Sequence, residues 1–415
     1  MMLLELDKVA VSPASADDAV GGVQPDFVAR PTSTEEVSTV LAAARERGLA
    51  VVPRGAGTTL AWGAPPCRAD LVVDLTGLTG VVEHVAGDLV VVVRAGTRLT
   101  DLQAALAGSG QRLGIDGDHG PATIGGLVAH GLAGPSRLAY GTLRDLLIGA
   151  TFVRADGVAA RTGGKVVKNV AGYDLGKLLH GSWGTVAVLT ELVFRLHPLP
   201  EATRWVTVRP GSGEAAGTLA RRVLHSQLVP AALELDRPAG GPLTVSILLE
   251  GRAATVAERA TALAELAGDA DITDIAPPWW GRRPAGQAGS DAVLLRLTTE
   301  VASLPRLLAG VEDAALATGL SVDLRGSAGA GSLLAAVRGG SGGPADASCL
   351  IELVGRLRRY AGGLGGTVVV LDGPPGSVGD VDRWGPVPGL DLMRRIKAQF
   401  DPDRILSPGR FVGGI

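Results

Sequence analysis

A chain of 415 residues, of which 46% are hydrophobic and 20% charged, is globular in composition and long enough for two or three domains of roughly 100–200 residues each. Its net charge of −3 argues against general nucleic-acid binding, and two cysteines, Cys67 and Cys349, are too few for an iron–sulfur cluster held by this chain alone. No apolar stretch reaches the length of a membrane span, and the N-terminus lacks the basic region typical of a signal peptide. A cytoplasmic protein is expected, in contact with a membrane only through its partners.

Residues 25–200 are expected to form one α+β domain. The segment Ser33–Glu36 has the pattern of a capping box, and apolar residues at helical spacing continue this helix to Gly48. Apolar and alternating runs predict strands at 50–53, 71–75, 81–85, 89–94, 149–154 and 185–196, with a second helix at 100–106. The His-Pro-Leu-Pro sequence at 197–200 breaks the pattern and marks the end of the domain.

Residues 201–385 change character, because strand-like runs alternate there with helical patterns. The predicted strands are 205–208, 232–235, 245–249, 293–297 and 321–324, and the predicted helices are 215–224, 255–266 and 304–317. This order suits a ferredoxin-like antiparallel sheet with helices on one face. Two glycine-rich stretches, Gly326–Gly343 and Gly373–Gly379, are expected to be mobile loops or lids. Residues 386–415 should form a helix, Leu390–Phe400, and a tail that returns to the first domain.

Residues 53–59, Pro-Arg-Gly-Ala-Gly-Thr-Thr, follow a predicted strand and carry two closely spaced glycines. Such a loop can turn its backbone N–H groups towards a pyrophosphate, because no Cβ blocks a close approach. The spacing is not that of a Rossmann fingerprint, and the Gly-Lys-Ser/Thr of a Walker loop is absent. Taken alone, the loop is equally consistent with a plain glycine turn.

Three further segments of the same domain carry residues suited to a site. Residues 116–126, Asp-Gly-Asp-His-Gly-Pro-Ala-Thr-Ile-Gly-Gly, form a turn that enters a helix with two glycines, which disfavour a helix unless a flat ring or a phosphate lies against the backbone. Residues 140–145 read Tyr-Gly-Thr-Leu-Arg-Asp, and residues 181–191 read Gly-Ser-Trp-Gly-Thr-Val-Ala-Val-Leu-Thr-Glu. Each segment is a weak signal by itself.

In this order and at these distances, the segments resemble the FAD-binding domain of the vanillyl-alcohol oxidase superfamily, also called PCMH-type. The shared pattern runs from a Pro-x-Ser/Thr-x-x-Glu-Val helix through the glycine loop to the final Thr-Glu strand, and it lies between Arg30 and Glu191. The resemblance implies that the glycine loop and the Thr-Ile-Gly-Gly turn hold the FAD pyrophosphate and that backbone near the last strand meets the adenine. Several members attach FAD to a histidine at the position of Thr58. Threonine cannot form that bond, so FAD is expected to bind non-covalently.

The residues expected to contact FAD come from all of these segments. They are Pro53, Arg54, Gly55, Ala56, Gly57, Thr58, Thr59, His119, Pro121, Ala122, Thr123, Gly125, Gly126, His130, Gly131, Tyr140, Gly141, Gly184, Val186 and Val188. No metal ligand set is expected, and the sequence assigns no catalytic residue.

Residues 131–137 and 163–175, the second of which includes Lys-Asn-Val-Ala-Gly-Tyr-Asp, are similar to the FAD-binding E-subunit family of bacterial glycolate dehydrogenases (glycolate oxidases). The tail at 400–410 is similar to the family's Phe-Asp-Pro…Asn-Pro-Gly ending, with Ser407 in place of asparagine. This resemblance implies a complex with two partners, a paralogous FAD subunit and an iron–sulfur subunit, that acts on a small 2-hydroxy acid.

The chain lacks the His-x-Gly-Asp/Glu-Gly-Asn-x-His stretch that related D-2-hydroxyacid dehydrogenases carry in their second domain, since His225 is the only histidine after residue 200. Oxidising a 2-hydroxy acid requires a base for the hydroxyl proton, a cation for the carboxylate and a hydride acceptor. The chain is therefore expected to support or relay electron transfer from the catalytic paralogue to the iron–sulfur subunit. Two alternatives stay open: a stand-alone FAD-dependent oxidoreductase for another hydroxy acid or alcohol, and an assembly protein with a structural flavin.

Two residue pairs have no assigned role. Lys165 and Lys168 cluster in a lysine-poor chain, which is consistent with a cationic patch near the flavin, a subunit contact or a solvated turn. Trp279 and Trp280 follow two prolines and suit either an exposed interface anchor or a plug in the core.

Overall fold

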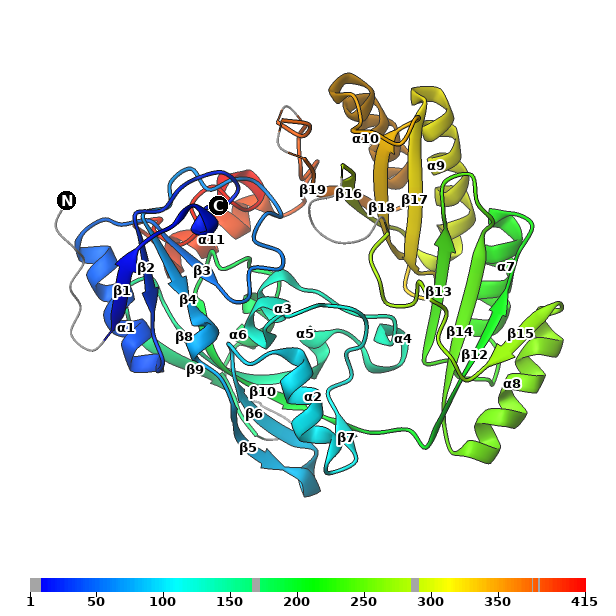
Figure 1. Cartoon of the computed structure of the whole chain (residues 1–415), viewed down its shortest axis with the longest axis horizontal. Coiled ribbons are helices and arrows are strands. Elements are labelled where there is room, and N and C mark those ends of the chain that lie inside the picture. Colours follow the sequence, from blue (N-terminus) through cyan, green and yellow to red (C-terminus); the bar gives the residue numbers. More distant parts are fainter. Residues whose placement is uncertain (1–8, 166–171, 285–290, 375, 380) are drawn as a thin grey trace.

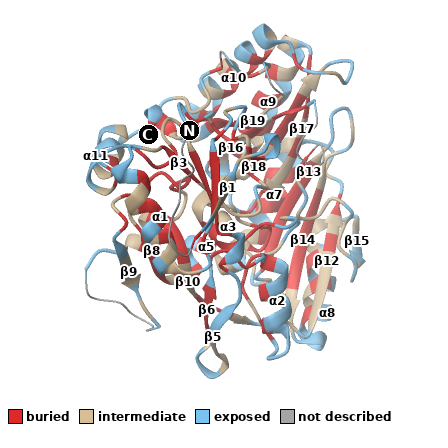
Figure 2. Cartoon of the chain, turned by 60° about the vertical axis from the view of Figure 1, so that its left-hand side comes forward, coloured by how far each residue is buried: buried red, intermediate tan, exposed pale blue. Residues whose placement is uncertain are grey.

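The computed structural model describes residues 9–165, 172–284, 291–374, 376–379 and 381–415, and it contains two sheet-based halves (Figure 1). The first half holds a four-stranded and a five-stranded sheet, and the second is built on one eight-stranded sheet. The strands hold much of the buried surface, whereas the C-terminal helix α11 (Leu390–Phe400) is largely exposed (Figure 2).

The four-stranded sheet places the predicted glycine loop at one of its edges. Its order is β1-β2-β4-β3, where β1 is antiparallel to β2, and β2, β4 and β3 are parallel. The strands are β1 (Ala10–Pro13), β2 (Phe27–Arg30), β3 (Val51–Arg54) and β4 (Leu71–Asp74). Helix α1 (Thr34–Glu46) connects β2 to β3 and begins as predicted, since the Ser33 side chain accepts a hydrogen bond from the Glu36 N–H. The glycine loop follows β3 at the carboxyl ends of the parallel strands, where open α/β sheets bind ligands.

The five-stranded antiparallel sheet has the order β5-β6-β10-β8-β9. Its strands are β5 (Val81–Val85), β6 (Val90–Arg94), β8 (Leu147–Val153), β9 (Ala159–Gly163) and β10 (Val188–Arg195). The helices around it are α2 (Leu99–Ala107), α3 (Ile124–His130), α4 (Arg137–Tyr140), α5 (Leu143–Leu146) and α6 (Leu175–Leu179). Their core contains Phe152 and Phe194, both almost fully buried. A two-stranded ladder, β7 (Gln111–Arg112) with β11 (His197–Pro198), closes this half.

The eight-stranded sheet consists of two ferredoxin-like βαββαβ repeats, which confirms and extends the predicted architecture. The first repeat is β12 (Ala202–Val208), α7 (Gly213–Leu224), β13 (Ala232–Arg237), β14 (Thr244–Gly251), α8 (Ala253–Ala267) and β15 (Ala270–Thr273). The second is β16 (Val293–Thr298), α9 (Leu304–Thr318), β17 (Leu320–Ser327), β18 (Ser332–Gly339), α10 (Ala347–Gly362) and β19 (Thr367–Asp372). Antiparallel pairing of β13 with β17 joins the repeats into the order β15-β12-β14-β13-β17-β18-β16-β19.

The prediction of a mobile loop at Gly326–Gly343 was wrong, because most of that stretch is the end of β17, a turn and strand β18. The glycines obscured a buried Leu-Leu-Ala-Ala-Val run at 333–337, which pairs on one side with β17 and on the other with β16. Gly331, with φ +60°, forms the turn. Helix α10 and strand β19 were also missed. The described residues of Gly373–Gly379 lack regular secondary structure, and their role as a lid stays a prediction.

Side-chain alternation in the large sheet decides which residues face the first half of the molecule. Helices α7 to α10 lie on the face away from the first half (Figure 1). On β16, Leu295 and Leu297 pack into the core under these helices, so Arg296 between them points to the opposite face. Glu234 lies between two core leucines of β13 and is placed in the same way.

The C-terminal tail packs against the first half next to the glycine loop. The N–H of Val51 donates to the carbonyl of Ile405 at 2.7 Å, which adds the tail to the edge of β3. Arg410 is buried and donates to the carbonyls of Leu60 and Trp62 at 2.7 and 2.8 Å. The tail therefore fixes the backbone that follows the glycine loop.

Candidate functional site

The glycine loop, residues 55–59, presents a run of unused backbone donors. Its five consecutive N–H groups find no hydrogen-bond acceptor in the described part of the chain. Gly57 has φ +74°, and a Cβ built on it would meet no atom within 4 Å, so open space lies in front of this turn. Successive unpaired N–H groups in a turn form a concave site that attracts an anion. The local geometry is therefore that of a phosphate cradle.

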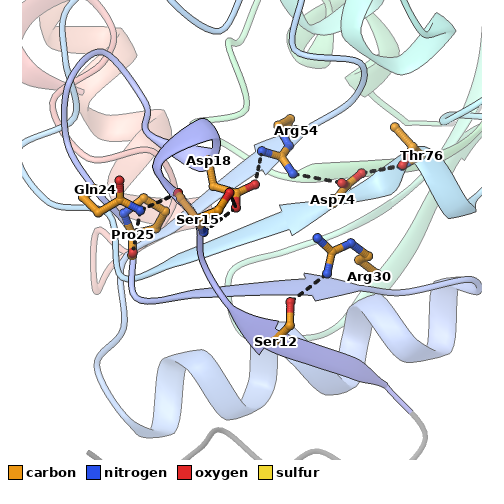
Figure 3. A network of polar contacts seen from close by, with 9 residues as sticks. All are labelled: Ser12, Ser15, Asp18, Gln24, Pro25, Arg30, Arg54, Asp74 and Thr76. Atoms are coloured by element: carbon orange, nitrogen blue, oxygen red, sulfur yellow. Dashed lines mark hydrogen bonds and ion pairs between the residues drawn. The ribbon is translucent and has the colours of Figure 1, made fainter.

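Arg54 anchors the start of this loop instead of pointing its charge into it (Figure 3). Its guanidinium forms ion pairs with Asp18 at 2.7 Å and Asp74 at 2.9 Å. A backbone hydrogen bond from Ser15, together with Arg54, lowers the pKa of Asp18 to about 2. The side chain of Arg54 thus holds the loop in place, which leaves the backbone of the loop to face a ligand.

A first cavity forms where the glycine loop meets the start of α3 and the turn before β10. Gly55 lies against Thr123, since a Cβ on Gly55 would be 2.1 Å from the Thr123 Oγ1 atom. The predicted residues that line this cavity are Pro53, Arg54, Gly55, Ala56, Gly57, Thr58, Thr59, Thr123, Gly125, Gly126, His130, Gly184 and Val188. Segments some 130 residues apart in sequence, from Pro53 to Gly184, are brought together here.

The sequence predicted that Gly125 and Gly126 make room for a ligand at the start of α3, but the structure shows close packing of the protein backbone there. The N–H of Gly125 donates to the carbonyl of Ala95 at 2.8 Å, and that of Gly126 points to the Thr123 hydroxyl at 3.3 Å. A Cβ on Gly125 would lie 2.8 Å from the Cβ of Ala95. Close backbone packing therefore explains Gly125 without any ligand, and the unused donors of the cavity belong to the glycine loop.

His130 provides a neutral polar group in the same cavity. Its ring lies between Trp62 and Trp183, at centroid distances of 6.3 and 4.5 Å. Burial lowers the pKa of His130 to about 3, so the ring is uncharged. The Nδ1 atom is buried and has no hydrogen-bond partner in the part of the chain that the structure describes. Such an atom calls for a partner, which an ordered water, an ion or a bound ligand can supply.

Seven predicted cofactor-contact residues lie outside the first cavity: His119, Pro121, Ala122, Gly131, Tyr140, Gly141 and Val186. His119 and Gly131 line a second cavity instead, and the His119 Nε2 lies 3.0 Å from the Asp116 carbonyl. The Tyr140 hydroxyl donates to Glu250 and accepts from Arg112.

The other predicted cofactor-contact residues outside the first cavity contact only the protein core, a turn or solvent. Ala122 and Val186 belong to the core of the five-stranded sheet, whereas Pro121 is exposed. Gly141 has φ +75°, and a Cβ there would lie 2.8 Å from the Asp145 carboxylate. The Tyr-Gly step therefore shapes a turn at the boundary between the halves and does not line the first cavity.

The second cavity, of about 280 Å³, lies between the first half and the large sheet. The two cavities are lined by consecutive residues, the first by His130 and the second by Gly131, so they lie near each other. Arg137 lines it from the first half, and Glu234 and Arg296 line it from β13 and β16. Sequence reasoning assigned no role to these three. For Glu234 and Arg296 the available signal was strand alternation, because a charged residue between two core leucines must point to the other face.

Trp279 and Trp280 are half-buried, and their role as an interface anchor or a core plug stays open. Trp280 packs edge-on against Trp205 at 6.1 Å, and Arg325 lies 5.9 Å from the ring centre of Trp279. Lys165 forms an exposed ion pair with Glu83. Lys168 lies outside the described residues, as do the other residues of 168–171, which begin the Lys-Asn-Val-Ala-Gly-Tyr-Asp sequence similar to the E-subunit family. Both cysteines are free thiols.

No helix in the described residues is long and apolar enough to cross a bilayer. Within the same residues, His, Cys, Asp and Glu side chains form no group of three or more that could hold a metal ion.

Comparisons with known proteins agree with the architecture. A family model of the FAD binding domain matches residues 25–163, and a model of the C-terminal domain of FAD-linked oxidases matches residues 383–411. Solved structures of alkyldihydroxyacetonephosphate synthase and of FgChi7B share the fold, each with a TM-score of 0.70, at 16% and 17% identity. The first likeness covers 94% of this chain and 78% of that one, and the second covers 96% and 95%.

Curated relatives point to oxidoreductases of hydroxy acids. Glycolate oxidase subunit GlcD of Bacillus subtilis (strain 168) is 30% identical over 93% of this chain and 88% of that protein. Glycolate oxidase subunit GlcE of Escherichia coli (strain K12) is 44% identical over 30% of this chain and 36% of that protein. D-lactate dehydrogenase of Archaeoglobus fulgidus is 36% identical over 45% and 41%. The chain therefore belongs to the family of FAD-linked oxidoreductases with a PCMH-type FAD-binding domain that includes glycolate oxidase and D-lactate dehydrogenase, and FAD is its cofactor.

Proposed function

We propose that this chain is the FAD-bearing subunit of a dehydrogenase for a small 2-hydroxy acid such as glycolate, that it binds FAD non-covalently and that it works with a paralogous FAD subunit and an iron–sulfur subunit. The observation that carries the proposal is the run of unpaired N–H groups at 55–59, which opens onto a cavity between segments of the FAD-binding domain. The local similarity to the GlcE subunit supports the place in a complex.

The residues of the first cavity fit the cofactor. Backbone N–H groups of Gly55 to Thr59 would donate to the pyrophosphate, and Gly57 leaves the approach open. The unpartnered Nδ1 of His130 would hydrogen-bond to the bound flavin nucleotide. Thr58 has no group that can form a histidyl bond to flavin. Bound FAD would supply the hydride acceptor that oxidation of an alcohol requires.

Non-covalent binding is tested by acid precipitation of the purified yellow protein. We expect all flavin to stay in the supernatant, and flavin retained by the precipitate would refute the assignment at Thr58. The complex is tested by affinity purification of the tagged chain from its native cell. We expect a second FAD protein and a cysteine-rich iron–sulfur protein to co-purify in fixed ratio. Recovery of the flavoprotein alone under mild conditions would contradict the subunit role.

A second candidate function is substrate oxidation by this chain itself, and the second cavity favours it. Arg137 and Arg296 supply the cations, and Glu234 the carboxyl group, that the sequence lacked in the form of a histidine motif. Anaerobic mixing of the isolated flavoprotein with glycolate, D-lactate and longer 2-hydroxy acids should bleach the flavin absorbance. An unchanged spectrum across this series would restrict the chain to a supporting or relay role.

A further inference from the structure

Arg137 and Arg296 line the second cavity, and neither forms an ion pair within the described residues. Arg137 donates only to the carbonyls of Gly134 and Ala133, each at 3.2 Å, and forms no ion pair there. Arg296 forms neither a hydrogen bond nor an ion pair in the same part of the chain. Burial lowers the pKa of both, and the charge of Arg137 adds to the shift at Arg296. A desolvated cation without a partner is unfavourable, so this pair favours binding of an anion.

Arg325, another arginine that lines the cavity, has an acid as its partner. The Nε of Arg325 lies 2.7 Å from the Asp236 carboxylate, and its Nη1 donates to the Arg283 carbonyl at 3.0 Å. Arg137 and Arg296 line the same cavity without such partners. Arg283, which also lines the cavity, forms no ion pair in the described residues either, but its guanidinium stacks over the Trp62 ring, 4.6 Å from the ring centre.

Glu234 lines the same cavity and its charge would act on Arg137, but burial disfavours that charge. Its residue is 6% exposed, and its Oε1 atom is buried with no hydrogen-bond partner in the described residues. Burial raises the pKa of Glu234 to about 8, against the opposing effect of Arg137. At neutral pH the carboxyl group is largely protonated, which leaves the two guanidinium charges uncompensated and places an O–H donor beside them.

The chemistry and size of the cavity select the ligand. Guanidinium groups bind carboxylates through paired, charge-assisted hydrogen bonds. The cavity volume of about 280 Å³ falls just below the range of about 300–1,000 Å³ typical of sites for drug-sized ligands, so a molecule of a few carbon atoms fits.

We propose that the second cavity binds the carboxylate group of a small organic acid through Arg137 and Arg296, with the carboxyl group of Glu234 beside it. The first and second cavities are lined by the consecutive residues His130 and Gly131, so a bound acid lies near the flavin site. The inference rests on the proposed function only for the identity of the natural acid. It assigns a substrate pocket to this chain that uses neither a histidine cluster nor a metal-ligand group.

The test is isothermal titration of the full-length, flavin-loaded protein with oxalate at pH 7. Oxalate carries carboxylates and has no C–H bond from which hydride could leave. Arg137→Met and Arg296→Met should each weaken oxalate binding by about tenfold or more, because each removes charge-assisted hydrogen bonds. The matched control is Arg209→Met, which removes one positive charge from an exposed pair with Asp271 outside the cavity and should leave the affinity unchanged.

Three outcomes would overturn the inference. The first is unchanged oxalate affinity in folded Arg296→Met protein. The second is binding of inorganic phosphate but not oxalate through the two arginines. The third is loss of FAD from both variants while their oxalate affinity stays normal, which would assign the arginines to the cofactor.

The same titration separates this inference from the proposed function. Oxalate is not oxidised, so a failure to oxidise glycolate leaves the binding result intact. Rapid glycolate oxidation by a double Arg137→Met, Arg296→Met variant would keep the function and refute the pocket.

Discussion

The Tyr140 hydroxyl donates a 2.7 Å hydrogen bond to the Glu250 carboxylate, which joins the FAD-binding half to the large sheet. Arg112 completes the contact by pairing with the same carboxylate at 2.5 Å and donating to the Tyr140 oxygen at 2.8 Å. Burial and the bond to Glu250 raise the pKa of Tyr140 to about 12, so the phenol stays protonated and acts as the donor. Tyr140 thus holds the two halves together and does not line the first cavity.

Tyr140→Phe should lower the free energy of unfolding by about 1–2 kcal/mol, since the hydrogen bonds to Glu250 and from Arg112 are lost while the ion pair between Arg112 and Glu250 stays. The flavin content should not change. Urea denaturation and the ratio of flavin to protein absorbance measure both quantities. Tyr173→Phe is the control, because Tyr173 is 90% exposed. Loss of flavin in Tyr140→Phe would restore the sequence-based expectation that this tyrosine contacts FAD.

Gly57→Val should empty the flavin site, because a β-branched side chain strains a residue with φ +74° and projects into the space in front of the glycine loop. Gly240→Val is a matched control, since Gly240 has φ +67° and open space but lies in the turn between β13 and β14. Both variants carry the same backbone strain, so only Gly57→Val should lose bound FAD. Equal flavin content in the two proteins would exclude the loop as the pyrophosphate site.

Lys397→Met should destabilise the protein by about 3 kcal/mol or more, because it leaves the buried carboxylate of Asp401 without its cation. The Lys397 Nζ lies 2.6 Å from Asp401 and also donates to the carbonyls of Thr185 and Leu406, which ties the tail to the turn beside Gly184. Lys177→Met removes an exposed pair and should change stability by less than about 1 kcal/mol. Similar denaturation midpoints for the two variants would contradict this account.

Oxalate affinity should fall as pH rises through about 8, by up to about tenfold per pH unit, because the ionised Glu234 carboxylate repels the anion. Arg137, Ser327 and Asp116 are the groups that act on this carboxyl. Burial lowers the pKa of His119, which keeps that ring uncharged over this range. Titration at pH 6.5 to 9 should show a flat profile in Glu234→Gln. Glu265→Gln, on an exposed part of α8, should keep the wild-type profile.

The raised pKa of Glu234 also predicts how the stability of the fold depends on pH. The folded-state pKa of Glu234, about 8, lies above its ordinary value of 4.5, so the fold favours the protonated form. Its contribution to stability is complete at acidic pH and is lost as pH rises towards and through 8. Glu234→Gln should therefore melt at a higher temperature than the wild type at pH 9, and their difference should shrink at pH 5. A pH-independent difference would show that the carboxyl does not titrate in the fold.

Much of the FAD-binding half could be predicted because its signals are local. The capping box at Ser33, the loop at 53–59 and the Thr-Ile-Gly-Gly turn each specify a backbone geometry within a few residues. Their order along the chain indicated the family before any contact was known. The large sheet was predicted only in outline. Glycines near Gly326 concealed strand β18. The two βαββαβ repeats share no sequence motif, so only the pairing of β13 with β17 reveals that they form one sheet.

The sequence by itself determined the glycine loop at 53–59, the absence of a histidine at position 58 and the lack of a histidine motif after residue 200. The tertiary structure alone decided that Arg54 faces two acids, that Tyr140 joins the halves and that Arg137, Glu234 and Arg296 line one cavity. The physical reason is that a glycine turn is encoded by neighbouring residues. A charge in a cavity instead depends on which strand faces meet across long separations in the chain, and on the burial that keeps Glu234 from neutralising its arginine neighbours.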